Sequence, residues 1–361
     1  MQREILAFCT YTAIMSGYFL RHVAPAALLL AAFGWLRRYR ETRRSKTLLI
    51  AGILLAVGVL TRMDVLLALP GLLFYAVWEP RPRPASGRDL LVRLLPLGQA
   101  VIVPVLISVL LLLYVNYLKW GRPMAAGGER ITQAFSAPLY VSLYGFLLSP
   151  GLGFFVYSPP ALLVLSAWKG FWRKCRAESI TVLTIGLIFL LSYSAYEDWH
   201  GLWSAPGPRY LFVLVPLVML PVGPWLDASR SRLARAWVGA LAAVGFVFQV
   251  PLMGVNFAYA YHHLGYPDYT PPYSFLFIPD HSPLVTSFRL LGEGYLADSW
   301  LLNLSRGWAG APGHPGVATC LFAVIASLLV LSLWMLSRNV KEAEKLPRDL
   351  PVDKGSERVA I

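Results

Sequence analysis

Long apolar runs alternate with short polar segments along most of the chain. A run of about 18 apolar residues with few charges is typical of a helix that crosses a membrane, because lipid offers no hydrogen-bond partner to exposed backbone groups. The pattern predicts an all-α, polytopic transmembrane helical bundle with about nine or ten spanning helices. The apolar runs are residues 5–20, 23–36, 47–78, 90–118, 151–168, 180–196, 210–226, 237–256 and 317–336.

The run at residues 47–78 is interrupted by two charges, Arg62 and Asp64. A single helix would place them near the bilayer centre, where each costs roughly 2.5–3.5 kcal/mol. A hairpin of two short helices places them at the outer surface instead, and it returns the basic segment 81–93 to the same side as the basic cluster 37–46. The loop charges therefore predict a hairpin, and a pair between Arg62 and Asp64 would lower the cost of both charges.

Composition agrees with a membrane protein. Of the 361 residues, 57% are hydrophobic and 14% are charged, whereas average soluble chains carry about 25% charged residues. The net charge is +13, but the basic residues fall in short clusters between apolar runs, which is typical of cytoplasmic loops and argues against a nucleic-acid partner. Attraction to anionic membrane lipid and orientation of the helices explain these clusters.

The alternation of sides divides the chain into a transmembrane domain and a tail. The transmembrane helical domain covers residues 1–337, and residues 338–361 form a cytoplasmic polar tail whose composition predicts disorder. Within the domain, the expected outer loops are residues 119–150, 196–209 and 257–316. The three cysteines have no paired spacing, so neither a disulfide framework nor a thiolate metal site is predicted.

One expected outer turn gathers the residue types that can carry chemistry. Glu197, Asp198 and His200 could transfer protons. Arg209, at a helix start, is suited to bind phosphate, because guanidinium and backbone amides both donate there. Trp203 could stack on a sugar or lie in an interfacial aromatic belt. A membrane-surface turn without chemistry explains the same residues, so both interpretations stay open.

The residues from 199 to 211, WHGLWSAPGPRYL, resemble the WxGGxxxGPRYL region of GT-C-type membrane glycosyltransferases, which include the protein O-mannosyltransferases and aminoarabinose transferases. Three further segments resemble motifs of the same family in the same order. They are residues 58–62 (GVLTR), 116–123 (NYLKWGRP) and 149–159 (SPGLGFFVYSP). The resemblance covers about residues 47–220.

The resemblance implies a GT-C-like membrane glycosyltransferase, or the larger part of one. Such an enzyme transfers a sugar from a polyprenyl-phosphate donor to an acceptor at the extracytoplasmic face, with inversion and without a nucleotide fold. Arginines would bind the departing phosphate, and aromatic residues would line the donor pocket. The residues assigned to substrate binding are Arg62, Arg209, Tyr210, Tyr157, His200 and Trp203.

The base that would activate the acceptor is harder to assign. In the family it is a carboxylate in the first outer loop, but Glu4 is the only acidic residue before Arg37. We therefore expect this chain to lack the N-terminal catalytic-loop module, through a split or truncated gene, a partner subunit that supplies the loop, or a degenerate member. Chemistry alone suggests Asp198, Glu197 or Glu129 as substitute bases.

Two other functions and a metal site compete with this interpretation. The chain could be a non-catalytic membrane subunit or a degenerate remnant that retains the lipid-donor groove. A transporter of a lipid-linked anion is disfavoured, because the ionisable residues gather at helix ends and no repeat is visible. No cofactor is assigned, although a divalent metal is an alternative in the loop 257–316; its spacing fits no known ligand pattern. The residues concerned are His262, His263, Asp268, Asp280 and His281.

Overall fold

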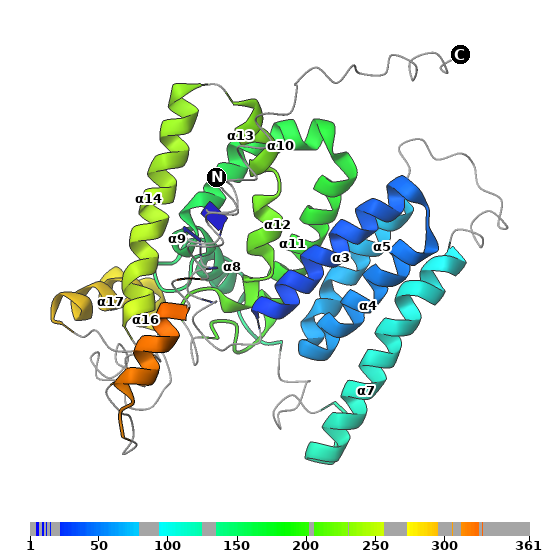
Figure 1. The fold of residues 1–361 in the computed structure, drawn as a ribbon, viewed down its shortest axis with the longest axis horizontal. Helices are drawn as coiled ribbons and strands as arrows, with labels where there is room; N and C mark the ends of the chain where they lie inside the picture. The colour runs from blue at the N-terminus through cyan, green and yellow to red at the C-terminus, as the bar shows by residue number, and fades with distance from the viewer. Residues whose placement is uncertain are drawn as a thin grey trace. The chain divides into compact units, whose positions relative to one another are not determined.

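The computed structural model describes residues 22–78, 94–124, 135–201, 206–229, 231–255, 273–294 and 312–324, with the single residues 5, 6, 9, 10, 12, 15, 305 and 327. The chain forms two compact units, Met1–Leu296 and Ala297–Ile361. The described part of the first unit is helical and contains no strand (Figure 1). In the second unit the main described element is a short apolar helix, Pro315–Val324.

The structure describes a series of helices in the first unit. In chain order they are α3 (Val23–Thr42), α4 (Ser45–Thr61), η1 (Met63–Ala68), α5 (Leu69–Val77), η2 (Gly98–Ile102), α7 (Val103–Trp120), α8 (Leu139–Leu148), α9 (Phe154–Tyr157), η4 (Pro159–Leu162), α10 (Leu163–Lys174), α11 (Arg176–Ala195), η5 (Arg209–Leu211), α12 (Leu214–Met219), α13 (Val222–Ala228), α14 (Arg232–Gly254), α16 (Tyr273–Phe277), η6 (Pro279–His281) and α17 (Pro283–Gly292).

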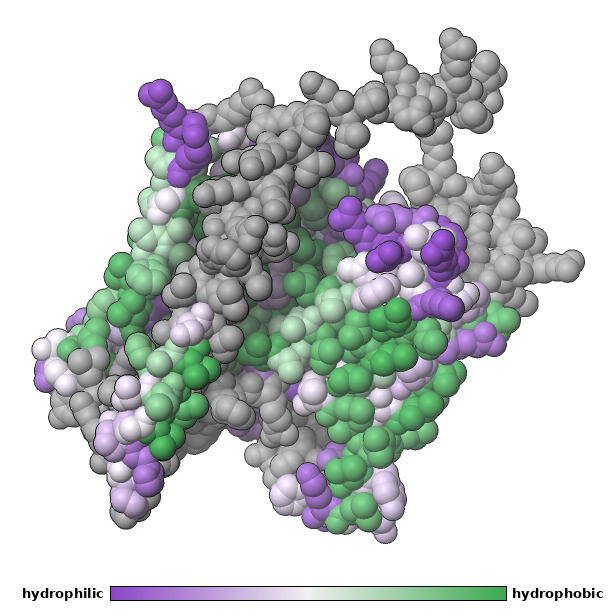
Figure 2. All heavy atoms as spheres, viewed as in Figure 1, coloured by the Kyte–Doolittle hydropathy of each residue, from purple (hydrophilic) through white to green (hydrophobic). Residues whose placement is uncertain are grey.

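Among the described residues, three helices are long and apolar enough to cross a membrane. They are Leu94–Trp120, Arg176–Ala195 and Arg232–Gly254. Their surfaces stay apolar where they face outward: on α7, Leu106, Ile107 and Leu110 are each at least half exposed. Figure 2 shows such apolar surface in green over the right-hand helices. The all-α fold that the sequence predicts is therefore confirmed for the described residues, and three helices have the length and composition of membrane spans. A polytopic bundle with nine or ten spans stays a prediction.

Residues 45–77 form the hairpin that the loop charges predict. α4 ends at Thr61, and Arg62 is extended (φ −153°, ψ 124°) before η1 and α5 continue the chain. At the far end of α5, Tyr75 contacts Arg40 near the end of α3, whereas Arg62 contacts His22 at the start of α3. Since α4 begins beside the end of α3, α4 and α5 run in opposite directions, and Arg62 lies in the turn between them.

Two apolar runs form broken helices instead of the continuous spans that the sequence predicts. Residues 151–168 contain α9, η4 and only the first half of α10, because Pro159 and Pro160 have no N–H to continue a helix. Residues 210–226 divide into η5, α12 and α13 for the same reason, with Pro221 between the last two. The basic cluster 37–46 also differs from a simple loop, because α3 continues to Thr42.

α7 is preceded by a π-helical segment that packs closely on α4. Pro104 cannot donate a hydrogen bond to the carbonyl four residues earlier, and a π turn shifts the pattern by one residue: the N–H of Val103 bonds to Gly98. This segment lies against Gly52, where an added Cβ would be 1.8 Å from the carbonyl oxygen of Ala100. Small residues at helix contacts allow such approach in membrane bundles.

α11 is the central helix of the packing around the site. It contacts α5, α8, α10 and α12. Gly71 of α5 allows a close contact, since a Cβ there would lie 2.8 Å from Ile185 of α11. Phe146 of α8 and Phe189 of α11 are fully buried, and the ring of Phe146 contacts Trp199 in the segment that follows α11. The end of α11 is thereby fixed beside the turn between α4 and η1.

Candidate functional site

A largely buried ion pair occupies the turn between α4 and η1. The Nε of Arg62 donates to both carboxylate oxygens of Asp64 at 3.0 Å, and its Nη2 lies 2.8 Å from Oδ2. The two side chains are 19% and 11% exposed. Asp64 is in the first turn of η1, where a negative charge is favourable. The pair that the sequence predicts is thus present, and each charge lowers the cost of burying the other.

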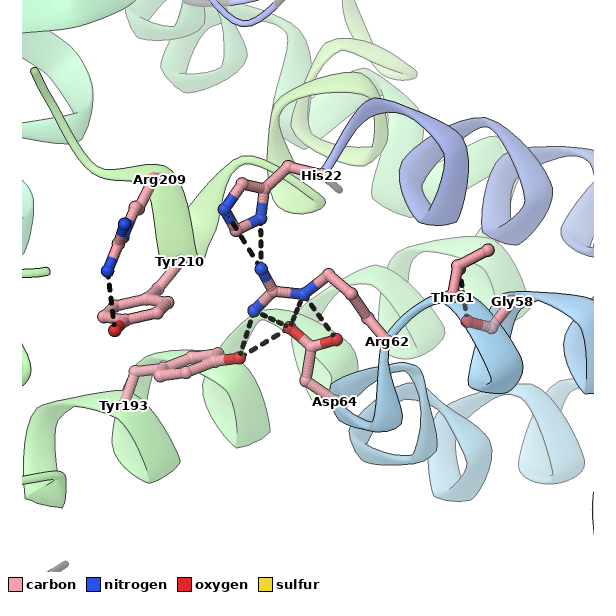
Figure 3. A network of polar contacts seen from close by, with 8 residues as sticks. All are labelled: His22, Gly58, Thr61, Arg62, Asp64, Tyr193, Arg209 and Tyr210. Atoms are coloured by element: carbon pink, nitrogen blue, oxygen red, sulfur yellow. Dashed lines mark hydrogen bonds and ion pairs between the residues drawn. The ribbon is translucent and has the colours of Figure 1, made fainter. Parts of the chain in front are cut away.

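Two residues from other helices complete this network (Figure 3). The hydroxyl of Tyr193 donates to Oδ2 of Asp64 at 2.5 Å and accepts from Nη2 of Arg62 at 3.2 Å. The ring of His22, which is 4% exposed, lies against Nη1 of Arg62, with Nε2 at 3.0 Å. A ring nitrogen accepts this hydrogen bond only when it is unprotonated. Neither His22 nor Tyr193 belongs to a motif that the sequence offers, so their part in the network appears only in the structure.

Tyr193 connects the ion pair to the second arginine. Its ring stacks on that of Tyr210, with centroids 4.6 Å apart and an interplanar angle of 8°. The guanidinium of Arg209 lies 4.9 Å from the centre of the Tyr210 ring, and its Nη2 donates to the Tyr210 hydroxyl at 3.2 Å. Arg62 and Arg209 therefore flank one pair of stacked tyrosines, as Figure 3 shows.

The turn after α11 is built to hold Arg209 and Tyr210 in this position. Gly201 has φ +55°, and a Cβ there would lie 2.5 Å from Cε2 of Tyr210 and 2.8 Å from Nε of Arg209. Trp199 anchors the turn: it is 1% exposed, and an added Cβ on Gly145 of α8 would lie 2.3 Å from its ring. Only glycine fits at either contact, so the turn and α8 are closely fitted.

Of the candidate bases, the structure describes Glu197 and Asp198, while Glu129 lies outside the described residues, as does Trp203. Nε2 of His200 lies 3.8 Å from Oδ1 of Asp198, and the side chains are 17% and 42% exposed. Burial lowers the pKa of His200 below 6.5, the nearby Asp198 raises it, and Arg209 lowers it further. His200 is therefore neutral at neutral pH and is able to accept a proton.

Tyr157, the other tyrosine assigned to the donor pocket from the sequence, is the last residue of α9. It is fully buried, and its backbone carbonyl accepts a hydrogen bond from Nε2 of Gln249 at 3.0 Å. Asp280 and His281 lie in η6, whereas His262, His263 and Asp268 fall outside the described residues. In the part of the chain that the structure describes, no group of three or more His, Cys, Asp or Glu could hold a metal ion.

Two cavities are lined by residues of α11, the helix that carries Tyr193. One, of about 420 Å³, is lined by Thr61, Arg62, Asp64, Tyr193 and Asn116, with apolar residues of α4 and α7. Three of its polar residues, Thr61, Arg62 and Asn116, come from the motif segments 58–62 and 116–123, which are far apart in the sequence. The cavity therefore offers a cation at the boundary between polar and apolar surface.

The second cavity is an apolar groove of about 350 Å³ between α10, α11 and α12. Val182, Gly186 and Leu190 line it along successive turns of α11, a length of about 12 Å. Leu211 closes one part of the groove, two residues after Arg209, and Leu190 lies one turn before Tyr193. The groove thus follows the apolar part of α11, and its lining includes residues within three positions of each stacked tyrosine in the sequence.

Comparison with known proteins adds no relative to this description: no family model, no curated protein and no solved structure matches the chain.

Proposed function

We propose that the chain is a GT-C-like membrane glycosyltransferase, or the larger part of one. It transfers a sugar from a polyprenyl-phosphate donor to an acceptor at the extracytoplasmic face. In this proposal the bundle has about nine or ten spanning helices, and the basic loops and the polar tail are cytoplasmic. The network around Arg62 and Arg209 then lies on the extracytoplasmic side.

One observation carries the proposal: the two arginines that the motifs single out flank the same pair of stacked tyrosines. Arg62 bonds to Tyr193, which is 131 residues away in the chain, and Tyr193 stacks on Tyr210 beside Arg209. A site for a lipid phosphate needs cations at the end of an apolar groove. The groove along α11 supplies apolar surface within a few residues of both tyrosines.

The chemistry follows from this arrangement. An acceptor hydroxyl oxygen attacks the anomeric carbon on the face opposite the lipid phosphate and loses its proton to a base. The bond between the anomeric carbon and the phosphate oxygen breaks, and the phosphate leaves with the electron pair. Arg209 stabilises the charge on the departing phosphate, since a guanidinium can donate two parallel hydrogen bonds to it.

A specific observation favours a second function, a non-catalytic subunit that binds the donor. Asp64, the carboxylate that lines the cavity, is already bonded to Arg62 and Tyr193, so it is a poor base. Asp198 and Glu197 lie in the turn after α11, and neither lines that cavity. If neither Asp198 nor His200 accepts the proton, a partner subunit with an acidic outer loop must do so.

The test is binding and turnover of a radiolabelled polyprenyl-phosphate hexose in membranes that contain the chain. The experiment is run with the chain alone and with the products of its neighbouring genes. Arg209→Lys should weaken donor binding, because an ammonium group cannot replace a bidentate guanidinium contact. Arg235→Lys, a matched change at an exposed position of α14, should leave binding unchanged.

The outcomes separate the functions. Turnover supports the enzyme, and binding without turnover in either preparation supports the non-catalytic subunit. A chain that neither binds nor turns over the donor, or that binds it equally after Arg209→Lys, removes the assignment.

A further inference from the structure

A second polar pocket lies at the opposite end of the same helices. It has a volume of about 470 Å³, and it is lined by residues from the ends of α3 and α5 and from the start of α11. Glu178 at this end of α11 and Tyr193 at the other end are 15 residues apart, or about 22 Å along the helix. The pocket is therefore separate from the network around Arg62.

Arg40 is held in this pocket before any ligand binds. Its guanidinium lies 4.5 Å from the centre of the Tyr75 ring, and its Nη1 is 3.7 Å from Oε1 of Glu178. The hydroxyl of Tyr75 donates to the same carboxylate oxygen at 2.7 Å. Arg40 and Glu178 are only about one fifth exposed, at 20% and 22%. The contacts among Arg40, Tyr75 and Glu178 thus fix one cation in a defined orientation, and they occupy one of the pocket's two carboxylates.

The other charges leave the pocket positive. Arg37, Arg43 and Lys174 also line it, and the second carboxylate, Glu41, pairs with Arg37 at 3.3 Å on an exposed surface. Four cations thus face two carboxylates around one cavity. An anion with several acceptor oxygens would satisfy this surplus, and a phosphate group has the oxygens and the charge to do so.

The surroundings indicate where that phosphate comes from. Trp78 lines the pocket. On α10, Trp168 and Trp172 precede Lys174, and their ring centroids are 6.3 Å apart. Tryptophans beside basic residues at helix ends are typical of the boundary between bilayer and water. We propose that this pocket binds the phosphate-bearing headgroup of an anionic phospholipid from the leaflet at the basic end of the bundle.

The test uses Cys175, which lines the pocket, as a built-in reporter. Burial raises the pKa of its thiol and Glu178 raises it further, against Arg37 and Lys174, so alkylation by a maleimide is followed at alkaline pH. Peptide mass spectrometry gives the rate at Cys175 for the purified full chain in neutral detergent. Short-chain phosphatidylglycerol should slow alkylation saturably, whereas short-chain phosphatidylcholine and inorganic phosphate should not at the same concentration.

Two variants separate a site from diffuse attraction. Arg43→Gln should raise the half-protecting concentration of phosphatidylglycerol about tenfold, by removing a charge-assisted contact. Arg38→Gln removes one charge from the same helix end, at an exposed residue outside the pocket. At high salt, where long-range attraction is screened, this variant should change the half-protecting concentration less than about twofold. The proposal would be overturned if both variants raised the half-protecting concentration equally, or if phosphatidylcholine protected Cys175 as well as phosphatidylglycerol does. Protection by inorganic phosphate at the same concentration would assign the pocket to a soluble anion and overturn the lipid assignment.

Discussion

Replacing Gly201 by alanine should disrupt the stacked tyrosines and cost about 2–3 kcal/mol of stability. The first contribution is backbone strain, since φ is +55° and an L-residue there costs about 1–2 kcal/mol. The second is steric. The new Cβ would lie 2.5 Å from Cε2 of Tyr210, so the ring must withdraw by about 0.9 Å to reach ordinary contact at 3.4 Å. That movement weakens its stacking on Tyr193, which contributes about 0.5–1.5 kcal/mol.

Gly121→Ala separates the two contributions. Gly121 also has a positive φ, +67°, but nothing lies within 4 Å of its added Cβ, so this change introduces strain without a clash. The assay is the free energy of unfolding in mixed micelles for both variants, together with binding of the labelled donor. Gly201→Ala should be the more destabilised by about 1 kcal/mol, and it alone should weaken donor binding. Equal destabilisation with unchanged donor binding would show that Gly201 does not support the tyrosine pair.

Three other changes probe the packing and the network. Gly52→Ala should destabilise the bundle by about 1–3 kcal/mol in the same unfolding assay, because the new Cβ meets the backbone of Ala100, which cannot rotate away. An unchanged free energy of unfolding would rule out the close approach of α4 to the π-helical segment. Tyr193→Phe should cost about 1–3 kcal/mol by removing a hydroxyl from the Arg62–Asp64 pair, and it should leave secondary structure by circular dichroism intact; a cost near zero would mean that the hydroxyl is not part of the network. Because the pKa of His200 is lowered, the unfolded chain binds more protons just below pH 6.5, so stability should fall as the pH falls below 6.5, and His200→Gln should flatten that slope. A slope that His200→Gln leaves unchanged would assign it to other groups.

The hairpin was predictable because its reason is local. Arg62 and Asp64 interrupt an apolar run, and the bilayer makes any arrangement that leaves them at its centre costly. The same cost argument predicts that the two charges pair, and the structure contains that pair. Helices could also be predicted as a class, since lipid excludes unpaired backbone groups.

The partners of Arg62 were not predictable in the same way. Tyr193 belongs to an apolar run in which a tyrosine near a helix end is ordinary, and His22 follows a segment without a motif. Their roles arise only when α3, α4 and α11 pack, which a linear pattern does not specify. The breaks at Pro159 and Pro221 carried a local signal, but the apolar pattern around them continues without interruption and masked it. Close packing at Gly52 likewise depends on which helix lies opposite, so nothing near it in the sequence indicates it.

The contacts of Arg62 also divide the roles of the two arginines. A guanidinium has five N–H groups. In Arg62 the Nε and Nη2 donate to Asp64, Nη2 also reaches Tyr193, and Nη1 contacts His22, so each of its three nitrogens already has a protein partner. A phosphate at this cavity would be attracted by the charge of Arg62 but would accept a hydrogen bond from at most one of its N–H groups. Breaking the bonds to Asp64 would leave a largely buried carboxylate without its partner, which is costly. Arg62 therefore acts mainly by fixing the turn, and the proposed reaction assigns the bidentate phosphate contact to Arg209, whose Nη2 donates to the hydroxyl of Tyr210 at 3.2 Å.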